Sequence, residues 1–439
     1  MRKIRLLRNL SFFDSLMLGI GFIIGSGILL MPILAAKEAG TFSLAAWVIA
    51  GVYCMLTGFC FAECAAKLPK AGGLYSYAHA AFGDFIGFMT GWAFWFSYWI
   101  TIATEQWAVA WYLKFFLPEL SDFYRIVIAA SSGLFLTLLN FRGVKGSGDV
   151  EDVFTVGKLL PLLLFAVVGL FFINFQNYYP LLPAGKELLP AIGSATILVL
   201  WAYQGAEIIT VPEEEIKNAK KTVPKAIIIS VVTVTAIYLL VSSVTLGVAR
   251  WELFANSESP LADISEIFLG KIGGIVLAVG GLVSILGALN AVILASARVA
   301  FAMSRDKLFP KSFSRLHKKF HTPHVALLVQ TVLAMLLTFV PFVLARYGVI
   351  LDFAGLASLV VFFTIIPYLF SSVAVLRLIK KAKGELHVIE SRLIPILSGV
   401  ASLCLLIFFY NNVFVLMLGL VLFCLGLVAY VLRKQFARM

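Results

Sequence analysis

The stretch Gly19-Ile20-Gly21-Phe22-Ile23-Ile24-Gly25-Ser26-Gly27-Ile28 lies in the middle of an apolar segment that runs from about residue 11 to residue 36. A helix needs about 20 mostly apolar residues to cross a bilayer, whereas each interior glycine costs about 1 kcal/mol relative to alanine. The first two glycines suit close helix packing. We interpret Gly25-Ser26-Gly27 as an unwound stretch at mid-membrane, because Pro32 follows it and the glycines cluster at the depth of a midplane site.

An unwound stretch would leave backbone N–H groups free at the start of the second half-helix, where the helix dipole also attracts a carboxylate. The sixth apolar segment carries a matching interruption, Leu200-Trp201-Ala202-Tyr203-Gln204-Gly205-Ala206-Glu207. Carbonyls freed at this second break would suit an ammonium group. Interrupted segments at corresponding places in two halves of a chain are typical of inverted-repeat transporters, so the pair of breaks predicts a site for a zwitterion.

The composition places most of the chain in lipid. The 439 residues are 61% hydrophobic and 13% charged, against about 25% charged in a typical soluble domain. Backbone groups in lipid must pair internally, which leaves helices or closed barrels. The apolar runs do not alternate with period two, so a barrel is excluded. We therefore expect an all-α membrane protein with one transmembrane domain over residues 1–439 and no soluble domain at either end.

Twelve apolar segments are long enough to be predicted as crossings. The turn between the last two is only Tyr410-Asn411-Asn412. The predicted ranges are 11–36, 42–66, 84–113, 124–141, 150–174, 188–211, 224–249, 272–304, 323–345, 350–376, 393–410 and 412–432.

The basic residues predict the orientation. With the N-terminus in the cytoplasm, 26 of the 35 Lys and Arg residues fall in cytoplasmic segments and 7 in outer segments, while Lys158 and Arg298 lie within helices. This split follows the positive-inside rule and predicts that both termini are cytoplasmic. The net charge of +12 then faces anionic lipid, so the bilayer is the expected partner and no nucleic acid is needed. The sequence predicts no particular oligomeric state.

Other classes of protein fit less well. The five cysteines lie in apolar stretches with no His or acidic cluster beside them, so we expect no metal, disulfide or cofactor. No HExxH set, Ser/His/Asp order or phosphate-binding loop indicates an enzyme. A channel would need a continuous polar pore or rings of charge, whereas the polar residues here gather at two breaks. A channel or a sensor built on a transporter fold stays an alternative.

Several motifs, taken in order, resemble the amino acid–polyamine–organocation superfamily, in the branch of bacterial amino acid permeases and exchangers. The resemblance runs from end to end, and any one motif alone is weak. The motifs are Gly21–Ile28, Phe61-Ala62-Glu63, Leu68–Tyr77 with Ala81-Phe82-Gly83, Trp201–Glu207, Glu213–Asn218 with Val223–Ile227, and Ser304–Pro310.

This resemblance implies a fold and a site. The fold would be a five-plus-five inverted repeat with helices one and six broken, spanning about 11–174 and 188–376, followed by two extra helices at about 393–432. The substrate carboxylate would meet the amides of Ser26 and Gly27, and its ammonium would meet carbonyls near Ile23 and on the second break. The full predicted set at the two breaks is Ile23, Gly25, Ser26, Gly27, Trp201, Ala202, Tyr203, Gln204 and Gly205.

Two positions bear on the substrate class. In relatives that exchange arginine or putrescine, a tryptophan at the place of Trp201 gates the site, and an aromatic residue on helix eight and an asparagine on helix three complete it. By this resemblance those two positions fall at Val292 and Ile102, which are both apolar. A cation is usually held over an aromatic face, so we favour neutral amino acids, with a basic amino acid or polyamine antiporter as the alternative.

We consider four ionisable residues within predicted crossings, since such groups are functional candidates. We expect one of them, Arg298, to extend its side chain to the cytoplasmic end of its helix. Lys158 would fill the place that sodium takes in sodium-coupled relatives, either as a proton-linked cation or as a structural lock, and both predict sodium independence. Glu207 can titrate during transport or hold the broken helix in shape. Glu105 faces either the pocket or the outer vestibule, and in the pocket it would favour a cationic substrate.

Together these inferences predict a secondary transporter of amino acids in the cell (inner) membrane. It would work by alternating access and without sodium, either as an exchanger or as a proton-coupled permease. The sequence does not decide between these two modes, and it does not define the exact substrate.

Overall fold

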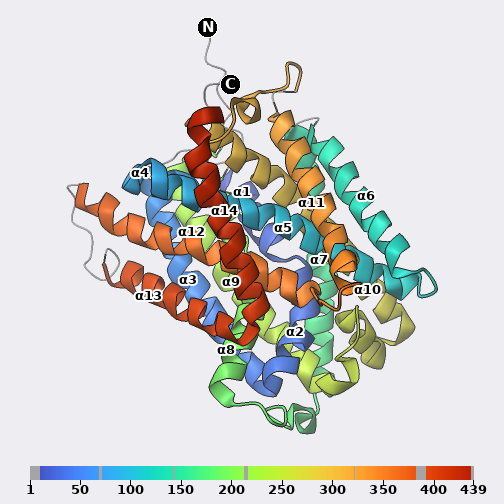
Figure 1. The fold of residues 1–439 in the computed structure, drawn as a ribbon. Coiled ribbons are helices and arrows are strands. Elements are labelled where there is room, and N and C mark those ends of the chain that lie inside the picture. Colours follow the sequence, from blue (N-terminus) through green and yellow to red (C-terminus); the bar gives the residue numbers. More distant parts are fainter. Residues whose placement is uncertain are drawn as a thin grey trace.

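The computed structural model describes residues 10–68, 72–141, 144–211, 216–320, 322–381 and 392–436. Within these ranges the chain folds into helices, which pack into one bundle (Figure 1), and it forms no strand. Several residues that belong to the motifs or to the count of basic residues lie outside the described part. They are Arg2, Lys3, Arg5, Arg8, Pro69, Lys70, Ala71, Arg142, Glu213, Glu214, Glu215, Lys383 and Arg438.

Each of the twelve predicted ranges contains a helix of the structure. The first range holds two, separated by a break, and the sixth ends in a break followed by a 3-10 turn. The helices are α1 (Phe12–Ile23), α2 (Ser26–Ala39), α3 (Ser43–Lys67), α5 (Asp84–Phe116), α6 (Asp122–Phe141), α7 (Val144–Gly169), α8 (Leu188–Tyr203) with η4 (Ala206–Thr210), α9 (Ala219–Val248), α10 (Pro260–Arg305), α11 (His324–Ala345), α12 (Phe353–Lys381), α13 (Ile394–Ile407) and α14 (Val413–Phe436).

Eight helical stretches within the described ranges are long and apolar enough to cross a membrane. Two of them, Phe12–Lys67 and Ile394–Arg433, each join two predicted crossings. The apolar stretch Gly157–Phe172, which joins the end of α7 to a 3-10 turn, is shorter, and α5 is not among the eight. The membrane character of the bundle is therefore evident, while the number of twelve crossings stays a prediction.

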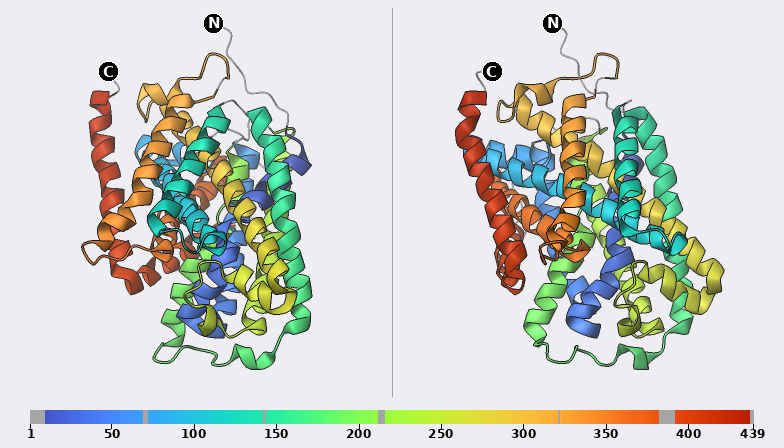
Figure 2. Two further views of the ribbon diagram at one scale, coloured as in Figure 1. Left: turned by 90° about the vertical axis from the view of Figure 1, so that its right-hand side faces the viewer. Right: turned by 45° about the vertical axis from the view of Figure 1, so that its right-hand side comes forward.

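The broken helices lie inside the bundle, and apolar side chains cover its outside. In the window of highest hydropathy within Ile394–Arg433, only 17% of the residues are buried, and α14, drawn in red, lies along one edge in both views of Figure 2. Side chains on its outer face, such as Val421 and Val431, are 59% and 72% exposed. Contiguous apolar surface of this extent suits contact with lipid rather than water.

Helices that the predicted repeat would relate pack against each other. α2 packs against α8, α3 against α9, α5 against α10, and α6 against α11. α2 and α8 approach closely at Gly27, where an added Cβ would lie 2.4 Å from the Cα atom of Ala202. The two breaks are therefore held side by side at the centre of the bundle.

Two helical segments were not expected from the sequence. α4 (Leu74–Phe82) is a short helix between α3 and α5. The first turns of α10, from Pro260 to Gly270, lie in what was predicted as an outer loop. The long helix bends at Gly270, whose φ of +64° suits glycine. Pro260 at the first position is a start signal that the hydropathy pattern obscured.

Candidate functional site

The first break lies between α1 and α2. α1 ends at Ile23, Ile24 is extended, Gly25 is the N-cap residue, and α2 begins at Ser26. Of the stretch predicted to unwind, only Gly25 is outside a helix, since Ser26 and Gly27 already belong to the first turn of α2. The first N–H groups of a helix lack an acceptor within it, and Gly25 offers no side-chain cap. The amides expected to meet an anion are therefore at a helix N-terminus.

The second break lies between α8 and η4. α8 ends at Tyr203, and Gln204 and Gly205 separate it from the 3-10 turn. Gly205 has a φ of +129°, which side chains with a Cβ rarely adopt. A Cβ there would lie 2.1 Å from Cδ1 of Phe22 on α1. Glycine is therefore required both by the turn and by the close approach of the two broken helices.

Tyr238 of α9 joins the two breaks. Its hydroxyl donates to the carbonyl of Ile23 at 2.7 Å and lies 3.0 Å from the carbonyl of Ala202. Both carbonyls lie next to a break and were predicted to face an ammonium group. One neutral donor therefore holds these two acceptors close together at the end of α1 and the end of α8.

A cavity lies between the breaks, α5 and α10. The predicted residues on its wall belong to the two breaks or are the acidic residues Glu105 and Glu207. Three further wall residues are on α5 and α10, and one is on α1. The lining residues are Phe22, Ile23, Gly25, Gly27, Tyr98, Thr101, Glu105, Trp201, Gln204, Glu207 and Ala288.

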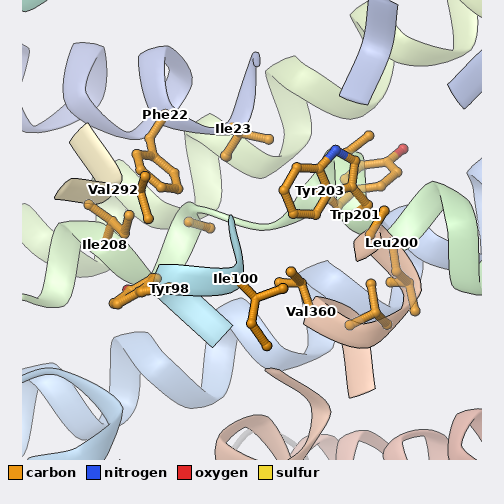
Figure 3. Close-up of a cluster of buried hydrophobic side chains, with 14 of the residues drawn as sticks. Phe22, Ile23, Tyr98, Ile100, Leu200, Trp201, Tyr203, Ile208, Val292 and Val360 are labelled. Atoms are coloured by element: carbon orange, nitrogen blue, oxygen red, sulfur yellow. The ribbon is translucent and has the colours of Figure 1, made fainter. Parts of the chain in front are cut away.

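Figure 3 shows a cluster of buried apolar side chains that includes Phe22, Ile23, Tyr98 and Trp201, which all line the cavity. Sequence reasoning missed Phe22, Tyr98, Thr101 and Ala288. Tyr98, Thr101 and Glu105 are spaced three and four residues apart, so they share one helix face. That polar face within an apolar helix was the signal that could have identified them.

Six of the predicted binding residues are not among those that line the cavity: Ser26, Ala202, Tyr203, Gly205, Ile102 and Val292. Ile102 and Val292 are fully buried and are not among the cavity's lining residues; Ala288, one turn before Val292, lines it instead. Tyr203 points away, and its hydroxyl donates to the carbonyl of Trp47 at 3.1 Å. Ala202 contributes through its carbonyl to the Tyr238 contact. A role for Ile102 and Val292 therefore stays a prediction that rests on the resemblance alone.

A chain of hydrogen bonds connects three elements at the cavity. Ser26 Oγ on α2 donates to Glu105 Oε1 on α5 at 3.0 Å, and Trp201 Nε1 on α8 donates to Ser26 Oγ at 3.3 Å. Glu105 is 4% exposed and Tyr98 is 3% exposed. Among the described residues, Glu105 Oε2 and the Tyr98 hydroxyl have no hydrogen-bond partner. The cavity therefore offers two buried polar atoms that a ligand can satisfy.

Glu207 holds the second break together. Its Oε2 accepts from the backbone N–H of Gly205 at 2.9 Å and from the hydroxyl of Tyr368 on α12 at 2.7 Å. The carboxyl group thus joins the break to a helix far along the chain. This geometry fits a role in shaping the break, and it leaves the carboxyl on the wall of the cavity.

Lys158 lies on the other side of the first break. Its ammonium donates to the carbonyl of Gly21 on α1, and Ser284 Oγ on α10 donates to the carbonyl of Ile24 at 3.1 Å. A second small cavity adjoins them, lined in part by Ile24, Lys158, Pro161 and Ser284. The carbonyls freed where α1 ends are thus met by a fixed cation and a hydroxyl.

A bundle of apolar helices with two broken members around one buried polar cavity defines the chain as a multi-pass membrane transporter. Comparison with known proteins agrees with this. The amino acid permease family matches residues 10–429. The chain therefore belongs to the amino acid permease family, within the amino acid–polyamine–organocation superfamily, and it is a transporter rather than an enzyme.

The chain is similar to several curated proteins over nearly its whole length. A branched-chain amino acid permease of Bacillus subtilis (strain 168) is 28% identical, covering 98% of this chain and 93% of the relative. A methylthioribose transporter of the same organism is 30% identical, covering 91% and 87%. A serine/threonine exchanger of that organism is also 30% identical, covering 88% and 87%.

Proposed function

We propose that the protein transports amino acids across the cell membrane by alternating access, as a sodium-independent exchanger or proton-coupled permease. The observation that carries the proposal is the meeting of opposite helix ends in one cavity. The amide end of α2 lies beside the carbonyl end of α8, and Gly27 and Gln204 both line the space between.

A zwitterion matches this arrangement chemically. A carboxylate is favoured at the N-terminus of α2 by N–H groups that have no acceptor within the helix and by the helix dipole. An ammonium is favoured at the C-terminal carbonyls of α1 and α8. Two of the named relatives are described as transporting amino acids, branched-chain or hydroxylated. The shared α-amino and α-carboxyl groups are therefore the part of the substrate that the breaks would bind.

Lys158 is the basis for sodium independence. Its ammonium donates to the carbonyl of Gly21, so a positive charge already meets the carbonyls near the end of α1. A sodium ion needs several oxygen ligands and would be repelled by an ammonium in the same place. We therefore infer that the protein needs no sodium ion to organise the first break.

The transmembrane arrangement belongs to the same proposal. We propose twelve crossings, two five-helix repeats of opposite orientation over 11–174 and 188–376, two further helices at 393–432, and both termini in the cytoplasm. The packing of α2 with α8, α3 with α9, and α5 with α10 supports the repeat. The unequal distribution of Lys and Arg supports the orientation.

Neutral amino acids are the proposed substrates. Ala288 and Val292 offer no aromatic face on α10 for a cationic side chain, and Glu105 is already hydrogen-bonded to Ser26. A basic amino acid or polyamine is the second candidate. One observation favours it, since Glu105 lines the cavity and its Oε2 has no partner among the described residues.

Uptake by purified protein in liposomes tests this proposal. Labelled neutral, basic and acidic amino acids would be offered without sodium, with and without unlabelled amino acid inside, and with and without an inward proton gradient. We expect uptake of neutral amino acids that is unchanged when sodium is added. Uptake of arginine, ornithine or a diamine instead would establish the second candidate. A requirement for sodium would contradict the role given to Lys158.

A further inference from the structure

The carboxyl group of Glu105 occupies the N-terminus of α2. Its Oε1 accepts from Ser26 Oγ at 3.0 Å, and the backbone N–H of Ser26 also faces the carboxyl group. A Cβ at Gly25 would lie 3.1 Å from the same oxygen, so the glycine leaves room for this approach. α2 has 14 residues and no side-chain cap of its own. A residue from α5 therefore takes the place of the missing cap.

The same place is where the proposed function puts the substrate carboxylate. Two ionised carboxyl groups cannot share one buried helix end, because like charges at short range disfavour each other's ionised form. Either Glu105 leaves, or it becomes neutral. It is held on a rigid 33-residue helix and is only 4% exposed, so neutralisation in place requires less rearrangement than departure.

Neutralisation requires a proton, and the charged and titratable groups around Glu105 indicate that Glu105 itself binds it. Lys158 on α7 is the cation that acts on it, but the Lys158 ammonium donates to Gly21. Glu207 is engaged by Gly205 and Tyr368. Tyr98 on the same helix face and Tyr238 on α9 are hydroxyl groups, and α10 presents Ala288. Among the buried side-chain atoms of the described residues that lack a hydrogen-bond partner, Glu105 Oε2 is the one carboxyl oxygen, and Glu105 lines the cavity.

We propose that Glu105 takes up one proton when an amino acid binds, and that this couples substrate binding to protons. Oε2 receives the proton, and the hydrogen bonds between the neutral carboxyl group and Ser26 weaken. The substrate carboxylate then accepts hydrogen bonds from the amide N–H groups at the start of α2. The O–H of Glu105 then donates to the substrate carboxylate. Release of the substrate returns the proton. This inference rests on the proposed function, because it needs a substrate with a carboxylate.

Binding measurements across about three pH units around neutrality test the proposal. If one proton enters with each substrate, the Kd rises about tenfold per pH unit once Glu105 is ionised in the free protein. In Glu105→Gln the amide imitates the neutral carboxyl, so binding should stay tight and become independent of pH. Proton-driven accumulation in liposomes should be lost in this variant, while exchange of internal for external amino acid continues.

Glu63→Gln is the matched control. Glu63 pairs with Lys67 at 3.3 Å on α3 and does not line the cavity, so this variant should keep the slope of the unmodified protein. A wild-type slope in Glu105→Gln would overturn the proposal, since the proton would then bind elsewhere. Loss of binding at every pH in a folded, monodisperse Glu105→Gln would also overturn it, because Glu105 would then be a ligand for the substrate.

A measurement on the unmodified protein does not depend on whether the variant folds. Adding a neutral amino acid to weakly buffered protein above neutral pH should remove about one proton from solution per substrate bound, as a pH dye reports. Binding without proton uptake would overturn the role of Glu105 and leave the transport function intact. Absence of binding for every amino acid would instead mean that the proposed function itself is wrong.

Discussion

At the scale of single residues, the hydroxyl of Tyr238 is the group that connects the two breaks. It satisfies the carbonyl of Ile23 and lies within reach of that of Ala202, and the tyrosine is fully buried. A buried acceptor that loses its donor costs about 1–3 kcal/mol. The free ends of broken helices in a membrane depend on a few such groups, because no water is present to replace them.

Tyr238→Phe should therefore lower the stability of the protein. We expect a loss of about 1–3 kcal/mol, from the unpaired carbonyls of Ile23 and Ala202, measured as a lower midpoint of thermal unfolding in detergent. Tyr112→Phe is the control, because Tyr112 is equally buried and its hydroxyl has no hydrogen-bond partner among the described residues. Equal unfolding of the two variants would mean that the Tyr238 contacts do not stabilise the breaks.

At the scale of elements, the sequence predicted both breaks, because glycine in an apolar helix is a local signal. The boundary of the first one was wrong by a residue or two. Ser26 begins α2, since a carboxyl from α5, 79 positions away, sits at the helix end. A cap supplied over that distance leaves no local pattern, so no reading of the first segment alone could have found it.

The same limit applies to two residues that were assigned to the site by resemblance. Ile102 and Val292 were assigned by position along a helix, but the rotation of α5 and α10 is set by packing, such as the approach of Gly25 to Ala288. Arg125 is a further case. It was counted as an outer surface charge, but it is 4% exposed and pairs with Glu258 at 3.0 Å. Its partner lies 133 positions along the chain.

Close packing of α2 against α8 makes Gly27 sensitive to substitution. In Gly27→Ala the new Cβ would lie 2.4 Å from the Cα of Ala202. Backbone cannot yield as a side chain can, so the two half-helices must separate, at a cost of about 1–3 kcal/mol. We expect uptake in liposomes to fall at least about tenfold, since a 1.4 kcal/mol change alone is a factor of ten.

Gly399→Ala on α13 is the control for this substitution. A Cβ there would lie 3.8 Å from Cδ1 of Leu369, an ordinary contact. Uptake should be unchanged, and stability should stay level or rise by up to about 1 kcal/mol from helix propensity. If the two variants transport equally well, close approach of the broken helices is not needed for function.

At the scale of the whole molecule, contacts between distant segments agree with the predicted sides of the membrane. Segments predicted as cytoplasmic meet one another: Leu10 pairs with Ile216, and Thr322 donates to Phe141. Segments predicted as outer do the same, as when Lys186 pairs with Glu38. In both views of Figure 2, the end of α14 and the loop after α10 lie opposite the connection from α7 to α8.

The contacts separate the two ends of the bundle but do not say which end faces the cytoplasm. Labelling of single cysteines can test this orientation. Three proposed crossings, 188–211, 224–249 and 272–304, separate Gly185 from Lys311, and an odd number puts them on opposite sides. Both residues are exposed. In a variant whose five natural cysteines are replaced, Gly185→Cys should react with a membrane-impermeant maleimide in intact cells. Lys311→Cys should react only after permeabilisation, because it lies in the most basic predicted loop.

Each other outcome of the labelling has a definite meaning. Reaction of Lys311→Cys alone in intact cells would reverse the orientation and place the basic loops outside, against the positive-inside rule. Reaction of both in intact cells would require an even number of crossings between them, which removes one of the three helices from the membrane. Since α8 carries the second break and α10 the wall opposite Gly25, that result would also remove the proposed midplane site.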